Sequence, residues 1–351
     1  MKRAPTLNDV ARVAKVSRSL ASLVFQDSPK VSEKSRAAVL KAAEKLGYQP
    51  NESARRLKSS VTRTIGMVLT DVHNTYYGQI FYGVENAASA LDYKLLIGNS
   101  GSDPDPKNPA LRKLGARQLE TLKTIRGQMV DGIICSSPQT TPEELRAAAK
   151  NSPLVLIGHT ASVLQNQFDV VSSDERDAAK QIVDHLTELG HKRISHISGG
   201  PEEGPSTRAK LFMSEMKKRG LSDEAKVYVG SWSQEAGYKF TEQILSEKKI
   251  PTAIYAANDL IAMGVLAKLK EANLRVPEDI SVLSYDDSVL ASLHLTNLTS
   301  MKEPLFEMGH AGFELLIKRI EGNEKNAPLQ HIKIIPKLIV RSSTGRSKSN
   351  K

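Results

Sequence analysis

The spacing of apolar residues along the chain predicts two differently built parts. Near the start, residues 7–25 (LNDVARVAKVSRSLASLVF) place apolar side chains three and four positions apart on both sides of a short joint, as two short amphipathic helices would. A third stretch with this spacing, lined by Val39, Ala43 and Leu46, ends at Gly47, and glycine is common where a helix ends. The first part is therefore predicted to be a small all-helical unit.

Beyond residue 64, short apolar runs alternate with helical patterns. The first expected strands are residues 65–69, 94–97, 132–135 and 154–157, with helices near residues 77–91 and 111–125. A second series begins around Phe168, with strands expected at residues 194–197, 253–256 and 280–283 and a helix at residues 177–189. This alternation predicts an α/β fold of doubly wound parallel sheets in two lobes. Residues 101–109 (GSDPDPKNP) are expected to form a surface loop.

Polar residues mark where the three short helices begin. Thr6 and Asp9 form a capping pair ahead of the first helix, and Ser17 and Ser32 are suited to cap the second and third. Two helices joined this closely are typical of a helix-turn-helix, in which the start of the second helix enters the major groove of DNA. The side chains predicted to face the DNA are Arg18, Ser19 and Ser22.

The composition fits a globular protein whose first part binds nucleic acid. With 351 residues, 40% of them hydrophobic and 25% charged, the chain can bury cores for two or three domains. Residues 1–63 carry 14 basic and 5 acidic side chains, a net charge of +9, and residues 341–351 carry +4, which leaves −3 for the rest. The basic head favours DNA binding, because phosphate neutralisation supplies most of the sequence-independent affinity.

Other features argue against several classes of protein. The sequence shows no apolar stretch of the length needed for a signal peptide or a membrane span, so a cytoplasmic location is expected. The single cysteine, Cys135, lies in an apolar run and is expected to be a core residue. The sequence lacks phosphate-loop and nucleophile-elbow motifs, and His185, His191 and His196 do not have a metal-binding spacing. We therefore predict no enzymatic activity, catalytic residue, metal or cofactor.

Polar residues gather where expected strands end, which is where ligands of open α/β sheets bind. Carboxylates that face an arginine suit a ligand with several hydroxyl groups, because carboxylates accept hydrogen bonds and guanidinium donates them. The polar candidates are Asp71, Arg208, Asn258, Asp259 and Asp286, and the aromatic candidates are Tyr76, Tyr77 and Trp232. The alternatives are structural, since an aspartate after a strand often caps the next helix and a tryptophan often packs in a core.

Several stretches of the chain resemble the LacI/GalR family of bacterial transcription regulators. They are TLNDVARVAKVSRSLASLVF and VSEKSRAAVLKAAEKLGYQPNESARRL in the head, and IGMVLTDVHNTYYGQIFYGVE, VDGIICSS, HLTELGHKRISHISGG, PTAIYAANDLIAMGVL, RVPEDISVLSYDD and PKLIVRSST in the rest. Lys15 stands where the family usually has the glycine of the turn. Leu20, Leu23 and Ser284 also differ from common family residues.

The resemblance implies a helix-turn-helix headpiece in residues 1–50, a hinge helix and linker in residues 51–63, and a disordered tail in residues 346–351. Residues 64–345 would form a two-lobed, periplasmic-binding-protein-like domain for effector binding and dimerisation. In this domain the chain is expected to cross between the lobes three times, the last time near residues 292–298. Arg208 aligns with the family's effector-binding arginine. Leu57 matches a hinge leucine that is inserted into the DNA minor groove.

The sequence predicts two sets of binding residues. The predicted DNA-binding residues are Thr6, Ser17, Arg18, Ser19, Ser22, Asn51, Ala54, Arg55 and Leu57. The predicted effector-binding residues are Asp71, Tyr76, Tyr77, Arg208, Trp232, Asn258, Asp259 and Asp286.

The function that uses every segment is that of a DNA-binding transcriptional regulator, a repressor, controlled by a small ligand. A periplasmic-type solute receptor would not need the basic head, and a helix-turn-helix fused to a sugar-processing enzyme would need a phosphate-binding loop. The expected effector is a sugar or polyol, the alternative being a nucleobase stacked on Tyr76 and Tyr77. Because one small headpiece reads few bases, we expect a homodimer on a palindromic double-stranded DNA operator.

Overall fold

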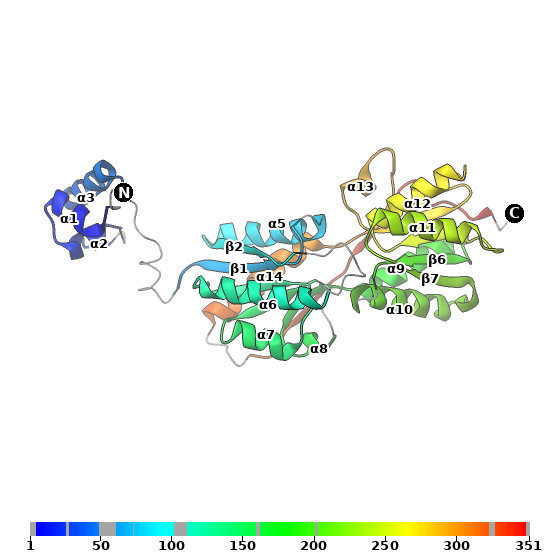
Figure 1. The fold of residues 1–351 in the computed structure, drawn as a ribbon, viewed down its shortest axis with the longest axis horizontal. Coiled ribbons are helices and arrows are strands. Elements are labelled where there is room, and N and C mark those ends of the chain that lie inside the picture. The colour runs from blue at the N-terminus through cyan, green and yellow to red at the C-terminus, as the bar shows by residue number, and fades with distance from the viewer. Residues whose placement is uncertain are drawn as a thin grey trace. The chain divides into compact units, whose positions relative to one another are not determined.

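The computed structural model describes residues 5–25, 28–48, 61–72, 74–101, 111–158, 162–200, 203–322 and 327–348. The chain divides into two compact units, Met1–Thr62 and Arg63–Lys351, whose elements are labelled in Figure 1. We call the first unit the headpiece and the second the body.

The headpiece is the predicted bundle of three helices. They are α1 (Leu7–Ala14), α2 (Arg18–Phe25) and α3 (Glu33–Leu46). Val10, Ala21 and Val39, one from each helix, are completely buried and form the centre of its core. Gly47 ends α3 with a φ of 63°, which is the left-handed conformation expected of a helix-terminating glycine. The helical prediction is confirmed.

The first lobe of the body is built on a six-stranded sheet in the order β11-β5-β4-β3-β1-β2, with every pairing parallel. Its strands are β1 (Thr64–Leu69), β2 (Lys94–Asn99), β3 (Gly132–Ser136), β4 (Leu154–Ile157), β5 (Asp169–Ser173) and β11 (His331–Ile334). Its helices are α5 (Thr75–Ala90), α6 (Leu111–Gly127), α7 (Pro142–Ala149), α8 (Ser162–Gln165) and α14 (Leu305–Glu321).

The second lobe has a second six-stranded sheet, in the order β12-β10-β9-β8-β6-β7, in which only the β10–β12 pairing is antiparallel. Its strands are β6 (Ile194–Ser198), β7 (Ala225–Val229), β8 (Ala253–Ala256), β9 (Ser281–Asp286), β10 (Thr299–Lys302) and β12 (Lys337–Ile339). Its helices are α9 (Glu175–Glu188), α10 (Glu203–Lys218), η1 (Ser222–Glu224), α11 (Gln234–Leu245), α12 (Asp259–Glu271) and α13 (Val289–Ser292).

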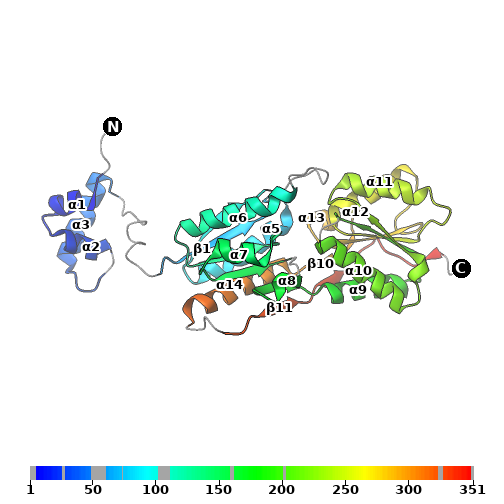
Figure 2. The same cartoon turned by 60° about the horizontal axis from the view of Figure 1, so that its bottom comes forward.

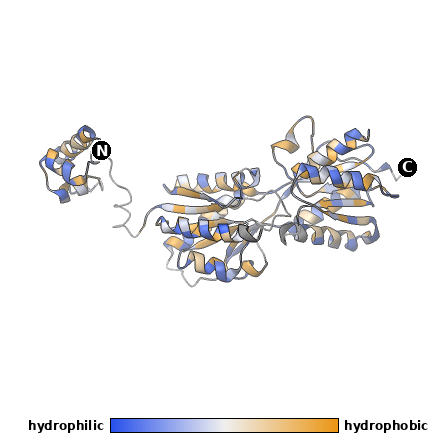
Figure 3. Cartoon of the chain, in the orientation of Figure 1, coloured by the Kyte–Doolittle hydropathy of each residue, from blue (hydrophilic) through white to orange (hydrophobic). Residues whose placement is uncertain are grey.

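Helices cover both faces of each sheet (Figure 2). Neighbouring residues of a strand point to opposite faces, so each strand packs against helices on both sides. In β1, Met67 packs with residues of α5 and α14, whereas Val68 packs with residues of α6 and α7. In β8, Ile254 faces α11 and α12, and Tyr255 faces α9 and α10. Strands buried on both faces therefore consist of successive apolar residues, and orange marks hydrophobic residues along the strands in Figure 3.

The chain passes between the lobes three times, as the resemblance implied, but two predicted boundaries are wrong. Phe168 was expected to open the second series, yet the next strand, β5, pairs with β4 in the first sheet. The three passages follow β5, β10 and β11. Residues 292–298 are not the last passage, because they lead from α13 to β10 within the second lobe. The lobe boundaries depend on pairing between strands that are distant in the sequence. The spacing of apolar residues does not reveal which strands pair.

The end of the chain also differs from expectation. A disordered tail was expected from residue 346, but Ser347 is buried and its amide donates to the Leu189 carbonyl at 2.9 Å. Lys348 forms an ion pair with Asp279 at 2.5 Å. Residues 346–348 are thus part of the second lobe. The loop expected at residues 101–109 lies, apart from Gly101, outside the described residues.

Cys135 is a core residue, as predicted. Its side chain is completely buried in the first lobe, and this burial raises the pKa of its thiol to about 12. Within the described residues, no helix is both long and apolar enough to cross a membrane.

Candidate DNA-binding surface and effector site

The predicted helix caps in the headpiece are present. The Thr6 amide and hydroxyl both donate to Asp9 Oδ2, at 3.0 and 2.7 Å. Ser17 Oγ accepts a hydrogen bond from the Leu20 amide at 3.1 Å, at the start of α2. Ser32 Oγ caps α3 by accepting from the Ser35 amide at 3.3 Å. These bonds satisfy amides that a helix start leaves without partners, so the joint between α1 and α2 is well defined.

The exposed side of α2 carries the side chains predicted to face DNA. Ala21 and Val24 of this helix are buried in the headpiece core, whereas Arg18 and Ser19 are exposed and Ser22 is partly exposed. The start of α2 therefore presents a cationic and hydroxylated surface, as major-groove recognition requires.

The tight joint before α2 depends on Lys15, which adopts a φ of 56°. This left-handed conformation is unfavourable for a residue with a Cβ atom, and it accounts for the glycine that is usual at this position. The remaining predicted DNA-binding residues, Asn51, Ala54, Arg55 and Leu57, lie outside the described residues.

In the first lobe, Tyr76 and Tyr77 stand at the start of α5, with ring centroids 5.0 Å apart in an edge-on arrangement. Asn74 fixes this helix start by accepting from the Tyr76 amide at 3.0 Å. Tyr76 is buried, and its hydroxyl lies so close to Gly158 that a Cβ atom there would be 2.5 Å away. Because Gly158 follows β4, the Tyr76 hydroxyl is at the carboxyl end of the first sheet, and the partly exposed Asp71 follows β1.

In the second lobe, the guanidinium of Arg208 contacts two carboxyl groups, a backbone carbonyl and an aromatic ring. It forms a two-pronged ion pair with Glu175, in which Nε and Nη2 lie 3.0 Å from the two carboxylate oxygens. Nη2 also donates to Glu303 Oε2 at 3.3 Å, and Nη1 donates to the Ala257 carbonyl at 3.1 Å. The guanidinium lies over the ring of Tyr285, 3.5 Å from its centroid. The arginine is only 4% exposed.

Two of the carboxyl groups near Arg208, those of Glu303 and Asp286, have raised pKa values. Burial raises the pKa of Glu303 to about 8, with the nearby Glu175 adding to the shift and Arg208 opposing it. Burial also raises the pKa of Asp286 well above its ordinary value, again opposed by Arg208. Among the described residues, Glu303 Oε1 and the Tyr285 hydroxyl are buried without a hydrogen-bond partner. We call Arg208, Glu175, Glu303, Tyr285 and Asp286 the Arg208 cluster.

Two predicted effector residues have structural roles. Asn258 caps α12, because its Oδ1 accepts from the Ile261 amide at 2.8 Å. Asp259 is buried and accepts from the Ser284 and Ser300 hydroxyls, at 2.6 and 3.1 Å, and from the Ser288 amide at 2.7 Å. Its carboxylate thereby joins β9, β10 and the start of α13. The structural alternative therefore fits both residues.

Trp232 follows β7, and its ring covers the carboxyl end of β6. It lies so close to Gly199 that a Cβ atom there would be 2.5 Å from the indole. Trp232 keeps 36% of its surface exposed. Its role as an effector contact stays a prediction.

The structure brings some of the predicted residues together and leaves others apart. Burial raises the pKa of Tyr76, the charge of Glu303 adds to this shift and the charge of Arg208 opposes it. Tyr76 of the first lobe therefore lies within electrostatic range of the Arg208 cluster. Asp286 is in the cluster, whereas Asn258 and Asp259 hold the second lobe together. Sequence reasoning missed Glu175, Glu303 and Tyr285. Glu303 directly follows β10 and Glu175 comes two residues after β5, so the strand-end rule would have found them had these strands been placed correctly.

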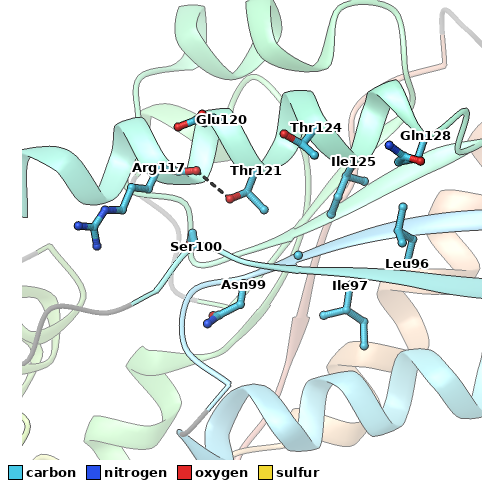
Figure 4. A pocket seen from close by; sticks show the side chains of 11 residues that line it. Leu96, Ile97, Asn99, Ser100, Arg117, Glu120, Thr121, Thr124, Ile125 and Gln128 are labelled. Carbon is cyan, nitrogen blue, oxygen red and sulfur yellow. Dashed lines mark hydrogen bonds between the residues drawn. The ribbon is translucent and has the colours of Figure 1, made fainter.

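A cavity of about 570 Å³ lies elsewhere, between α6 and the edge strand β2. Figure 4 shows Arg117, Glu120, Thr121 and Thr124 of α6 on one side of it and Leu96, Ile97 and Asn99 of β2 on the other. Among the described residues, none of those that line this cavity forms an ion pair. Within the described part of the chain, no group of three or more His, Cys, Asp or Glu side chains is arranged to hold a metal ion.

A three-helix headpiece with a helix-turn-helix, joined to a body of two parallel α/β lobes, is the architecture of an effector-controlled DNA-binding regulator. The model of the LacI family of bacterial regulatory proteins matches residues 6–51, and the model of the periplasmic binding protein-like domain matches residues 183–344. The catabolite control protein A of Priestia megaterium is 32% identical over 320 residues, which cover 89% of this chain and 92% of that protein.

Solved structures agree with this assignment. The lac repressor dimer bound to operator and the anti-inducer ONPF superposes with a TM-score of 0.85 at 25% identity, covering 98% of this chain and 100% of that one. The transcriptional regulator CelR in complex with cellobiose superposes with a TM-score of 0.68 at 28% identity, covering 97% and 99%. The chain belongs to the LacI family of bacterial regulatory proteins. It is a DNA-binding transcriptional repressor with an effector-binding domain.

Proposed function

We propose that a small hydroxylated ligand, a sugar or polyol, controls operator binding by this repressor from the carboxyl ends of the strands in the body. The Arg208 cluster supports this most directly, because it groups the buried Arg208 and Glu303 with the partly exposed Glu175 and Asp286 near the ends of β5, β9 and β10. Tyr76 and Trp232 would border the ligand. In this position the ligand would bias the arrangement of the two lobes and, through the hinge, the affinity for DNA.

The contacts favour a sugar over a nucleobase. A base needs an open aromatic face, but the face of Tyr285 is covered by Arg208, and Tyr76 is only 8% exposed. The exposed indole of Trp232 suits the C–H face of a sugar ring as well as it suits a base. The carboxyl groups of the cluster suit hydroxyl donors.

We also propose that the chain acts as a homodimer on a palindromic operator. The lac repressor dimer bound to operator, which this chain resembles over 98% of its length, supports this. Two headpieces would read two half-sites, with α2 of each in the major groove. Sedimentation should give a dimer at micromolar concentration, and a stable tetramer would contradict the proposal.

The experiment that tests the ligand proposal uses the full chain and an operator selected from random DNA. Thermal unfolding is measured with sugars, polyols and nucleobases, because a ligand that binds only the folded state raises the melting temperature by mass action. Ligands that stabilise the chain are then tested for a change in operator affinity. Stabilisation and a changed DNA affinity with a sugar or polyol are expected. Stabilisation by nucleobases alone would overturn the choice of ligand class.

A further inference from the structure

The Arg208 cluster contains more acidic than basic groups. Three carboxyl groups, those of Glu175, Glu303 and Asp286, are grouped around one described basic side chain. Arg208 forms a two-pronged ion pair with Glu175 and a single contact with Glu303, so these two carboxyl groups share one guanidinium. Asp286, which is partly exposed, forms no ion pair among the described residues. A carboxylate withdrawn from water without a counter-charge of its own is costly.

The hydrogen-bonding pattern shows the same imbalance. Glu303 is 4% exposed, and of its two carboxylate oxygens only Oε2 contacts Arg208. Its other oxygen, Oε1, is buried and has no hydrogen-bond partner among the described residues, and the same holds for the Tyr285 hydroxyl. Unsatisfied buried polar atoms are uncommon in folded proteins. Here two of them occur in one cluster, at the strand ends where ligands of this type of fold bind.

From the excess of carboxyl groups and the unsatisfied Glu303 oxygen, we infer that the effector carries an ammonium group on its hydroxylated frame, as an amino sugar does. The ammonium donates to Glu303 Oε1 and supplies a second positive charge to a cluster in which one guanidinium serves three carboxyl groups. This inference rests on the proposed function and names the chemical class of its ligand. An anionic ligand fits poorly, because the guanidinium of Arg208 is already engaged by Glu175, Glu303 and the Ala257 carbonyl.

The raised pKa values of Glu303 and Asp286 agree with this inference. In the absence of a cation, burial favours the protonated forms of both groups. A bound ammonium stabilises their charged forms, so its binding releases protons near neutral pH. Binding of a neutral sugar releases none from these groups. Proton release therefore separates an ammonium bound at this cluster from one bound elsewhere.

The test uses the full chain with matched ligands. Glucosamine, galactosamine, mannosamine and putrescine serve as amines, with glucose, galactose and mannose as neutral counterparts and glucose 6-phosphate as an anion. Thermal unfolding identifies the ligands that bind, and calorimetry in buffers of different ionisation enthalpy counts the protons released. We expect at least one amine to stabilise the chain more than its neutral counterpart and to release a proton on binding.

Variants then locate the ammonium. Glu303→Gln and Asp286→Asn remove one charge each, and both are expected to weaken amine binding about tenfold or more and to reduce the proton release. Glu314→Gln, on the exposed side of α14 with 60% of its side chain accessible, is the matched control and should bind as wild type does. Unliganded melting curves of all three variants establish that they fold.

The outcomes separate this inference from the proposed function. If a neutral sugar or a nucleobase binds and changes operator affinity while every amine fails to bind, the inference is wrong and ligand control remains. If amines bind equally well to Glu303→Gln and to wild type, the ammonium is not at this cluster and the inference is also wrong. If no ligand of any class changes stability or operator affinity, both proposals fail.

Discussion

Arg208 lies over the ring of Tyr285, with 3.5 Å between its guanidinium carbon and the centroid of the ring, and both side chains are buried. The stacking covers one face of the cation with an aromatic surface, while its edge is hydrogen bonded to Glu175 and Glu303. Cation–π contacts strengthen when the cation is removed from water. Arg208 thus joins α9, α10, β9 and the passage after β10, which makes it a structural centre of the body as well as a candidate ligand contact.

Replacement of this arginine is expected to destabilise the body strongly. Arg208→Met removes the charge that balances Glu175 and Glu303, and loss of one partner of a buried ion pair typically costs about 3–5 kcal/mol. Urea unfolding followed by circular dichroism measures the change. Tyr285→Phe is the matched comparison: its hydroxyl has no hydrogen-bond partner among the described residues, so we expect a loss below about 1 kcal/mol. Equal losses in the two variants would contradict this account.

The pH dependence of stability should carry a signature of Glu303. Its pKa is raised from 4.5 to about 8 in the folded chain, so between these values the folded state binds a proton that the unfolded state has lost. The contribution of this group to the free energy of unfolding is therefore greatest below about pH 4.5 and falls as the pH rises toward about 8. Glu303→Gln should remove this decline.

The comparison with the variant is essential, because other groups act in the opposite direction. Burial lowers the pKa values of His185, His191, His196 and His331, so each histidine contributes stability that increases as the pH rises. The quantity to measure is the unfolding free energy of wild type minus that of Glu303→Gln at each pH. It should decrease between about pH 5 and about pH 8. A difference that does not change with pH would show that Glu303 titrates normally.

Local signals in the sequence were sufficient for much of the fold. The caps at Thr6 and Ser17 and the ends of most strands follow from residues a few positions apart. The errors arose where distant segments pair. Placing β5 beside β4, and β10 between β9 and β12, depends on contacts that no window of the sequence contains.

The candidate site was predicted only in part for the same reason. Arg208 was selected from the sequence as an effector contact, which stays a prediction, but the glutamates that pair with it were not selected because their strands had been placed wrongly or not at all. Asn258 and Asp259 follow a strand as ligand residues would, yet their oxygens accept bonds from Ile261, Ser284 and Ser300. A polar side chain stabilises the fold when the folded chain brings hydrogen-bond donors close to it, and it is left to bind a ligand when no such donor is near.

In the headpiece, Lys15→Gly should stabilise the helix-turn-helix. Lys15 has a φ of 56°, a conformation that costs a residue with a Cβ atom about 1 kcal/mol relative to glycine. Slower hydrogen exchange of the α1 and α2 amides in the full chain would measure the gain. The opposite change at another left-handed position, Gly47→Ala at a φ of 63°, is the control and should accelerate exchange in α3. Faster exchange in Lys15→Gly would show that the lysine side chain stabilises the joint in another way.

Arg18 is expected to read a base. It lies exposed in the first turn of α2, and arginine is the side chain best suited to a two-pronged contact with guanine, worth about 1–3 kcal/mol of discrimination. Arg18→Ala should therefore relax the preference at one base pair in each half-site. Affinities for a set of single-base operator variants measure this. A uniform loss of affinity across the set would instead assign Arg18 to a phosphate contact.

The hinge prediction depends on Leu57, which lies outside the described residues and is predicted from the sequence alone. An apolar side chain inserted between base pairs in the minor groove unstacks them and bends the duplex, and the added contact offsets the cost. Leu57→Ser should lower operator affinity about tenfold or more and abolish DNA bending, as measured by fluorescence energy transfer between the operator ends. Salt-dependent binding to nonspecific DNA should persist, because the lysines and arginines that contact phosphates remain. A variant that still bends and selects its operator as wild type does would show that Leu57 packs against protein instead.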